Sequence, residues 1–118
     1  MSPISKELVG ASARPILLSI LSRGESYGYA ILQRVHDLSD GQLAWKDGTL
    51  YPVLHRLCDE RLITYEWRKA ETGRRRKYYA ITPRGEAALA VEKRQWLSVD
   101  AILARLWGLE HRLAALPG

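Results

Sequence analysis

The chain has 118 residues, 47% of them hydrophobic and 26% charged, which suffices for one domain with its own core but not for two. Its formal net charge at pH 7 is +5. It has no apolar run of membrane-spanning length, does not open like a signal peptide, and its single cysteine, Cys58, excludes an internal disulfide. These features predict a cytoplasmic protein with no membrane partner.

The first two predicted elements are helices. Apolar residues from Leu8 to Leu21 recur at helical spacing, and Pro15 is expected to divide or kink this helix. Ser26 is a good N-cap for a second helix, which Gly41 is expected to close and whose apolar face consists of Tyr27, Ile31, Val35 and Leu38. Residues 43–46 are expected to form a short strand.

A third helix is predicted from about Gly48 to Arg61, with Asp47 or Thr49 as its cap. Its core stripe follows helical spacing and consists of Leu50, Val53, Leu54, Leu57 and Cys58. The opposite face is polar and aromatic, and consists of Thr49, Tyr51, Pro52, His55, Arg56 and Asp59.

A hairpin follows the third helix. Residues 62–68 alternate and predict a half-buried strand with Ile63, Tyr65 and Trp67 on one face. The turn is expected at 71–73 and the return strand at 76–81, with Tyr79 and Ile81 facing inward. Thr82 and Pro83 are typical of the N-cap and first position of a last helix.

The net positive charge of the chain is concentrated in and beside this hairpin. The segment from Arg68 to Arg84 holds seven basic residues and one acid, Glu71, so its net charge is +6 and the rest of the chain sums to −1. Charge concentrated in one place suits a polyanion, and the lack of an apolar anchor favours nucleic acid over a membrane surface.

The order of helix, helix, helix, hairpin and helix predicts a mainly α fold with a small β-hairpin, the winged helix-turn-helix. In that architecture the third helix enters the DNA major groove, and the hairpin, or wing, contacts the minor groove or the backbone. We therefore expect residues 1–83 to form the DNA-binding domain and residues 84–118 to form a C-terminal dimerisation helix packed on it.

The last helix carries two apolar stripes. One has coiled-coil spacing and consists of Val99, Ile102, Leu106, Leu109, Leu113 and Leu116. Beside it lies a second, made of Leu89, Trp96, Leu103 and Trp107. Two stripes on a helix of a small domain favour a homodimer, which would suit a palindromic operator. The alternative is a helix that folds back and buries both stripes within the monomer.

Three segments resemble the PadR family of bacterial transcriptional regulators. They are residues 27–31 (YGYAI), 47–57 (DGTLYPVLHRL) and 73–82 (GRRRKYYAIT). The resemblance covers almost the whole chain and is closest to the subfamily with a single short C-terminal dimerisation helix. It implies a dimeric winged-helix repressor, often of a detoxification, transport or stress gene, that is released by a small molecule or another signal. The family usually has a glycine after the third helix, so Arg61 is expected to adopt the left-handed conformation, and Cys58 stands where the family commonly has glutamate.

The candidate DNA contacts on the helices are Ser26, Tyr29, Thr49, Tyr51, His55 and Arg56. Arg56 suits guanine N7 and O6, whereas Tyr51 and Thr49 suit phosphate. Ser26 and Tyr29 lie at the start of the second helix, where backbone amides favour an anion. The competing interpretations are that Tyr51 packs against the second helix and that Arg56 pairs with Asp59 or Glu60. Lys6 and Arg14 are weaker phosphate candidates.

The candidate contacts on the wing are Arg74, Arg75, Arg76 and Lys77. Because neighbouring residues of a strand face opposite ways, the four cannot all reach one groove. We expect Arg74 and Arg75 at the tip to reach the minor groove and Lys77 to contact phosphate. The competing interpretation is a solvated basic turn.

Trp96 is the candidate for binding a small aromatic effector. Its position resembles that of a tryptophan in one branch of the family, where paired indoles sandwich flat aromatic drugs at the dimer interface. The competing interpretation is that Trp96 packs in the dimer core. We predict no cofactor and no metal.

Other function classes fit the sequence less well. An enzyme is disfavoured because His36, His55, Cys58 and His111 are scattered, and no phosphate-binding glycine motif or nucleophile elbow occurs. A protein-interaction module that uses the last helix would leave the charge of the wing unexplained. A redox-sensing module would use Cys58, which is inert if it lies in the core. RNA is disfavoured because the fold suits the wide major groove of duplex DNA.

Overall fold

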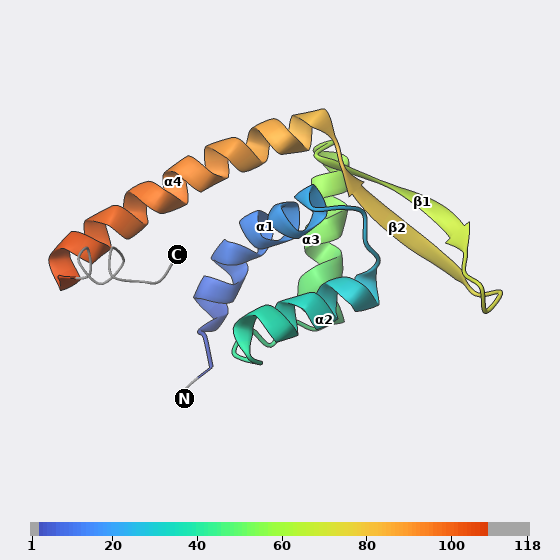
Figure 1. The fold of residues 1–118 in the computed structure, drawn as a ribbon, viewed down its shortest axis with the longest axis horizontal. Coiled ribbons are helices and arrows are strands. Elements are labelled where there is room, and N and C mark those ends of the chain that lie inside the picture. Colours follow the sequence, from blue (N-terminus) through green and yellow to red (C-terminus); the bar gives the residue numbers. More distant parts are fainter. Residues whose placement is uncertain (1–2, 109–118) are drawn as a thin grey trace.

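The computed structural model describes residues 3–108 and shows a mainly helical chain with one antiparallel hairpin (Figure 1). In chain order the elements are α1 (Lys6–Ser22), α2 (Gly28–Ser39), α3 (Asp47–Asp59), β1 (Ile63–Lys69), β2 (Arg75–Ile81) and α4 (Pro83–Trp107). The predicted order of helices and strands is confirmed.

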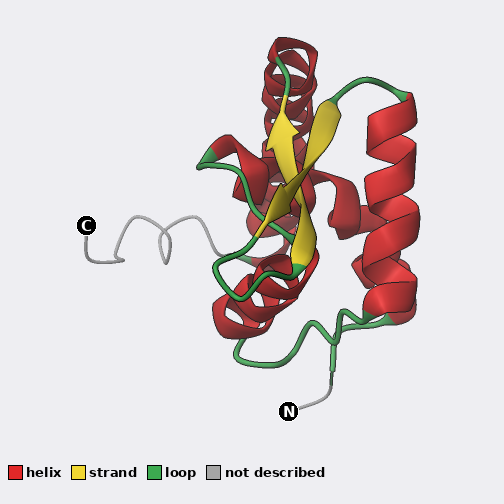
Figure 2. Ribbon diagram, turned by 90° about the vertical axis from the view of Figure 1, so that its right-hand side faces the viewer, coloured by secondary structure: helices red, strands yellow, loops and turns green. Residues whose placement is uncertain are grey.

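α1 lies at the centre of the molecule and contacts α3, α4 and β2. α4 crosses over α1, and the hairpin projects from the body beyond the helices (Figures 1 and 2). One core cluster joins all these elements, and it consists of Ala13, Leu17, Leu18, Leu21, Ile31, Val35, Trp45, Leu50, Val53, Leu54, Leu57, Leu62, Ile63, Tyr79 and Leu89. The core therefore holds the three-helix body together and reaches only the base of the hairpin.

α1 runs unbroken through Pro15, so the prediction that this proline divides the helix is wrong. A proline inside a helix costs about 3 kcal/mol. Pro15 is flanked by buried Ala13, Leu17, Leu18 and Leu21, and the burial of this face outweighs the missing backbone hydrogen bond.

α2 begins one residue later than expected. Its N-cap is Tyr27, which makes no side-chain cap bond, and not Ser26. Ser26 instead forms an isolated bridge with β2, in which its N–H donates to Tyr79 O at 3.0 Å and its carbonyl accepts from Tyr79 N at 2.7 Å. Pairing with the hairpin fixes the direction in which α2 starts.

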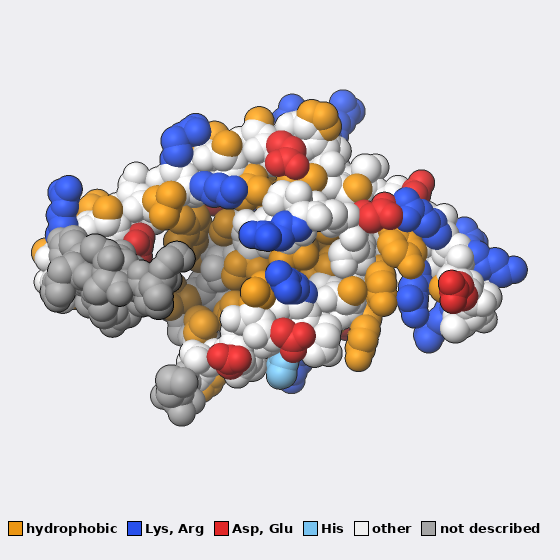
Figure 3. Space-filling view, viewed as in Figure 1, with side chains coloured by type: hydrophobic (Ala, Val, Ile, Leu, Met, Phe, Trp, Pro, Cys, Tyr) orange, Lys and Arg blue, Asp and Glu red, His pale blue; other side chains and the backbone are white. Residues whose placement is uncertain are grey.

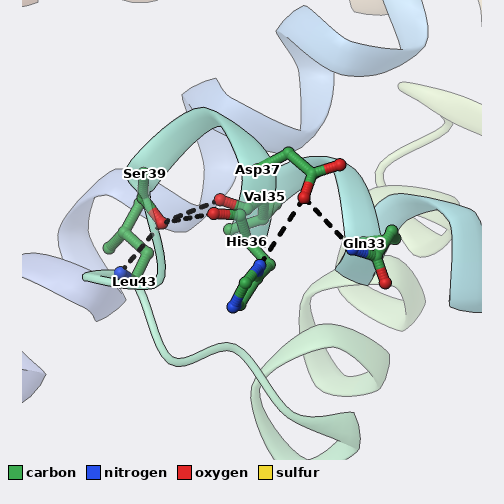
Figure 4. A network of polar contacts seen from close by, with 6 residues as sticks. All are labelled: Gln33, Val35, His36, Asp37, Ser39 and Leu43. Carbon is green, nitrogen blue, oxygen red and sulfur yellow. Dashed lines mark hydrogen bonds and ion pairs between the residues drawn. The ribbon is translucent and has the colours of Figure 1, made fainter.

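Residues 43–46, which follow the end of α2, do not form the predicted short strand. Asp40 ends the helix in the left-handed conformation, with φ of 51°. The Ser39 hydroxyl then donates to Val35 O at 2.9 Å and accepts from Leu43 N at 3.0 Å, which draws the following segment back onto the helix (Figure 4). The segment buries Trp45 in the core without strand pairing, whereas Leu38, predicted on the apolar face, is 61% exposed.

α3 buries its predicted stripe, with Leu50, Val53, Leu54 and Leu57 in the core. Its N-cap is Lys46, which makes no side-chain cap bond, so the caps predicted from Asp47 and Thr49 are wrong. The helix is followed by Arg61 with φ of 61°, which confirms the left-handed conformation expected at this residue.

The start of α4 is joined to the end of α3 by Thr82. Its N–H donates to Leu62 O at 3.0 Å, and its hydroxyl donates to Arg61 O at 2.7 Å while accepting from Gly85 N at 3.0 Å. The predicted roles of Thr82 as N-cap and Pro83 in the first turn are confirmed. Gly85 is buried directly against the Leu62 carbonyl and the Ile81 side chain.

We expect Gly85→Ala to destabilise the fold by about 1–3 kcal/mol, because the new methyl would overlap the Leu62 backbone, which cannot move aside alone. The matched control is Gly10→Ala in α1, where a methyl meets nothing within 4 Å and should stabilise by about 0.5–1 kcal/mol. Chemical denaturation measures both, and equal effects of the two substitutions would contradict the tight junction.

Candidate nucleic-acid interface

A groove with a cavity volume of about 600 Å³ lies between the start of α2, the exposed face of α3 and the hairpin. Its walls are aromatic and basic, and consist of Tyr27, Gly28, Tyr29, Tyr51, His55, Trp67, Arg74, Arg75, Arg76, Lys77 and Tyr79. Lys and Arg side chains gather around the projecting hairpin in Figure 3. We call this feature the wing groove.

The wing groove brings together most of the predicted DNA contacts, and these are Tyr29, Tyr51, His55, Arg74, Arg75, Arg76 and Lys77. Three predicted contacts lie elsewhere. Ser26 lines a different groove, formed by α1, α2 and α4, while Thr49 and Arg56 lie on α3 outside the wing groove. Arg56 is exposed on the last turn of α3.

Tyr51 packs against the second helix and also lines the wing groove. A Cβ atom on Gly28 would lie 2.5 Å from the Tyr51 hydroxyl oxygen, so the first turn of α2 approaches this ring as closely as only glycine permits. Tyr51 remains 39% exposed. The contact with α2 therefore orients the ring and leaves part of it open to the groove.

Arg14 pairs with Glu60, one of the two acids expected as partners of Arg56. Its guanidinium joins Glu60, just after α3, at 2.7 Å and Glu92 of α4 at 3.1 Å. The hydrogen bond with Arg14 lowers the pKa of Glu60. Arg14 is thus held within the protein, which weakens its candidacy as a phosphate contact.

The strand register divides the wing into two faces. Tyr65 pairs with Tyr79, Trp67 with Lys77 and Lys69 with Arg75, so these residues share one face. On this face the Lys77 ammonium lies 4.1 Å from the centre of the Tyr65 ring, and the Arg75 guanidinium lies 5.2 Å from the centre of the Trp67 ring.

The opposite face attaches the wing to the segment before α2. Arg68 pairs with Glu25 through both carboxylate oxygens, and the Arg76 guanidinium lies 4.5 Å from the centre of the Tyr27 ring. Tyr27 and Tyr78 meet edge to face at 5.4 Å. We call these residues the wing anchor, and they are Glu25, Tyr27, Arg68, Arg76 and Tyr78.

Sequence reasoning placed Tyr65 and Trp67 on a half-buried face, and this is wrong. Tyr65 is 46% exposed and Trp67 is 52% exposed, because β1 runs beyond the core after Ile63. The alternation was correct, but it cannot tell a face that packs on the body from one that lines an open groove. Trp67 is the wing-groove residue that the sequence analysis missed.

The first apolar stripe of α4 is open in the single chain. Val99 is 52%, Ile102 57% and Leu106 74% exposed. Leu109 and Leu113, predicted to continue this stripe, lie outside the described residues. Of the second stripe, Leu89 is buried, whereas Trp107 is 64% exposed.

Trp96 is 39% exposed and borders the groove formed by α1, α2 and α4, whose cavity volume is about 820 Å³. Ile16 and Ile20 of α1 and Leu38 of α2 line the same groove. This placement suits both an aromatic ligand and a dimer contact, so both interpretations of Trp96 stay predictions.

Two features are absent from residues 3–108. No helix in this range is long and apolar enough to cross a membrane. The same residues contain no group of three or more histidine, cysteine, aspartate or glutamate side chains placed to hold a metal ion.

Three packed helices followed by a basic hairpin define a winged helix-turn-helix protein. The sequence model of the PadR-like family of transcriptional regulators matches residues 17–91. The chain therefore belongs to this family, whose members are DNA-binding regulators and not enzymes. The resemblance noted in the sequence is confirmed.

Individual relatives agree with this assignment. The transcriptional regulator Rv3488 of Mycobacterium tuberculosis is 36% identical over 89 residues, which are 75% of this chain and 79% of that protein. The transcriptional regulator YqjI of Escherichia coli is 34% identical over 82 residues, 70% of this chain but 38% of that longer protein. A transcriptional regulator from Clostridium thermocellum has a similar structure, with a TM-score of 0.78 and 30% identity over 86% of this chain and 96% of that one.

We expect the ion pair of the wing anchor to persist at neutral pH and to be lost in acid. The hydrogen bond from Arg68 holds the pKa of Glu25 below its ordinary value of 4.5. A carboxylate with a lowered pKa contributes stability above its ordinary pKa and loses it as the pH falls through the lowered value. In an NMR titration the Glu25 carboxyl should titrate below pH 4.5, and Arg68→Gln should raise its pKa toward that value. A Glu25 titration that Arg68→Gln leaves unchanged would contradict the pairing.

Proposed function

We propose that the chain is a dimeric, sequence-specific repressor whose wing groove holds duplex DNA, with α3 in the major groove and the wing at the adjacent minor groove and backbone. The observation that carries the proposal is the convergence of α2, α3 and the basic hairpin on one groove. A solvated basic turn would not require a neighbouring helix to present Tyr51 and His55 to the same space.

The roles of α3 follow from its exposed face. His55 and Arg56 project from the helix, and within residues 3–108 the ion pair of Glu60 is with Arg14, which leaves the Arg56 guanidinium for a base edge. Thr49 lies in the first turn, near the backbone amides that favour phosphate. Base readout by Arg56 and backbone contacts by Thr49 and Tyr51 are the assignments that this arrangement supports.

The wing cations divide by face. Arg74 follows the turn and Arg75 and Lys77 lie on the groove-facing side, so these three are the proposed DNA contacts of the wing. Arg76 also lines the wing groove, but its guanidinium lies against the Tyr27 ring of the wing anchor, so we propose that it mainly orients the wing. Ser26 is paired with β2 through its backbone, which also supports a positioning role.

The partner proposed for α4 is a second copy of the chain. Exposed apolar residues along the helix, from Val99 to Leu106, have the spacing of a helix–helix seam and no cover within residues 3–108. A two-fold dimer would present two copies of α3, which predicts a palindromic operator. We also propose that residues 84–118 act as the dimerisation segment and residues 1–83 as the DNA-binding domain.

Cys58 gives no support to a redox-sensing alternative. It is partly buried and packs against the core, and this burial raises the pKa of its thiol. A raised pKa disfavours the reactive thiolate.

The test is selection of bound duplexes from a random pool, followed by a salt titration of the winner. We expect a palindrome with half-sites about one helical turn apart, which is roughly 34–36 Å. Arg74→Ala with Arg75→Ala should weaken binding to all sequences, and the slope of log K against log salt should become shallower by about 2, because two phosphate-neutralising charges are removed.

The matched control is Lys93→Ala, which removes one cation from an exposed position of α4, away from the wing groove. It should leave the salt slope unchanged. An unchanged slope in the double wing variant would remove the wing from the interface, and selection of no sequence would remove the proposed specificity.

The dimer is tested separately with Ile102→Glu. Ile102 is 57% exposed in the single chain, so the substitution should leave the fold intact and place a charge in the proposed seam. We expect sedimentation to show a dimer for the wild type and a monomer for the variant. Lys93→Gln lowers the net charge by the same single unit at another exposed position of α4 and should remain a dimer, whereas a dimeric Ile102→Glu protein would exclude this seam.

A further inference from the structure

We propose that Trp67 contacts DNA directly, packing its indole against the deoxyribose wall of the minor groove and supplying an uncharged part of the binding. The inference extends the proposed function, because it takes from it the placement of the wing at the minor groove. Trp67 is the one residue of β1 that lines the wing groove. The sequence pattern had predicted that β1 is half-buried along its length.

The position of Trp67 singles it out among exposed aromatic residues. Scattered apolar side chains on a protein surface need no explanation. Trp67, however, lines the wing groove opposite Tyr51 and His55 of α3, and it pairs across the hairpin with Lys77. Hydrophobic side chains lie between the basic tip of the hairpin and the body in Figure 3.

Two cationic side chains lie next to the Trp67 indole, and part of the ring is open to solvent. The Arg75 guanidinium lies 5.2 Å and the Lys77 ammonium 5.5 Å from the ring centre, so cations that would neutralise phosphates sit directly beside the ring. About half of the side chain, 52%, remains exposed. A duplex neutralised by Arg75 and Lys77 would therefore come within reach of the exposed part of the indole.

Tyr65 provides an internal comparison. It lies on the same face of β1, is exposed to a similar extent at 46%, and also has the Lys77 ammonium over its ring, at 4.1 Å. Tyr65 does not line the wing groove. If the only role of each ring were to hold Lys77 in place, then Tyr65 and Trp67 would contribute equally to DNA affinity.

Salt dependence separates an uncharged contact from an ionic one. Each cation that neutralises a phosphate releases counterions and steepens the salt dependence, whereas an aromatic contact releases none. The indole should therefore raise affinity by a similar factor at low and high salt.

The experiment measures the affinity of the selected palindromic duplex for four proteins over a range of salt concentrations. Trp67→Ala should weaken binding by about tenfold with an unchanged salt slope. Arg75→Ala should make the slope shallower by about 1. Tyr65→Ala should change affinity by less than Trp67→Ala and leave the slope intact. Circular dichroism and thermal unfolding confirm that each variant is folded.

A second readout reports contact itself. The part of the tryptophan fluorescence that Trp67→Phe removes should be quenched by acrylamide in the free protein and protected once the duplex is bound. A ring that only positions Arg75 and Lys77 would instead make the slope of Trp67→Ala shallower and leave its own quenching unchanged by DNA. Either of these results overturns the inference.

Arg75→Ala and Trp67→Ala together distinguish a failure of the proposed wing placement from a failure of the role of Trp67. If Arg75→Ala changes neither affinity nor slope, the wing does not lie on the DNA, and both the proposed placement and the role of Trp67 are wrong. If Arg75→Ala behaves as expected but Trp67→Ala binds like the wild type, only the role of Trp67 is wrong.

Discussion

The arrangement of the molecule depends on the junction at which the chain leaves α3 and later enters α4. The Leu62 carbonyl accepts a hydrogen bond from Thr82 N, Thr82 caps α4, and Gly85 lies directly against Leu62. The left-handed Arg61 turns the chain sharply enough to make this meeting possible. Because α3, both strands and α4 meet here, the directions of α3, the wing and α4 are set together.

Strand geometry then gives the wing two different surfaces. Beyond Ile63 the hairpin leaves the core, so hydrophobic burial no longer decides which face is inward. The wing anchor takes over this role on one face through Arg68, Glu25 and Tyr27, and the Ser26–Tyr79 bridge joins the base of the hairpin to the start of α2. Exposed ion pairs of this kind add little to global stability. Here they hold the outer part of the hairpin, whose direction is not set by burial in the core. The opposite face is thereby left facing α3.

The features predictable from sequence were those with a local physical cause. The apolar stripe of α3 and the Thr82–Pro83 start of α4 follow from side-chain periodicity and from capping chemistry within a few residues. The charge of the wing was equally visible, because it is concentrated in one segment. Two of the predictions that failed depended on distant partners. Ser26 has the side chain of a good N-cap, but its backbone pairs with Tyr79 of β2 instead. The exposure of Trp67 depends on how far the hairpin extends beyond the body.

Arg14 links α4 to the end of α3. Arg14 of α1 bonds at once to Glu60, just after α3, and to Glu92 of α4, so one guanidinium spans three helices beneath the exposed stripe. A partner that covers the exposed Val99 and Ile102 would contact α4 directly. A shift of α4 along α1 would stretch the charge-assisted bonds of Arg14. Thr82 also joins the start of α4 to the backbone just after α3, so two separate sets of contacts link α4 to the end of α3. The proposed dimer seam on α4 would thus set both the spacing and the tilt of the two copies of α3.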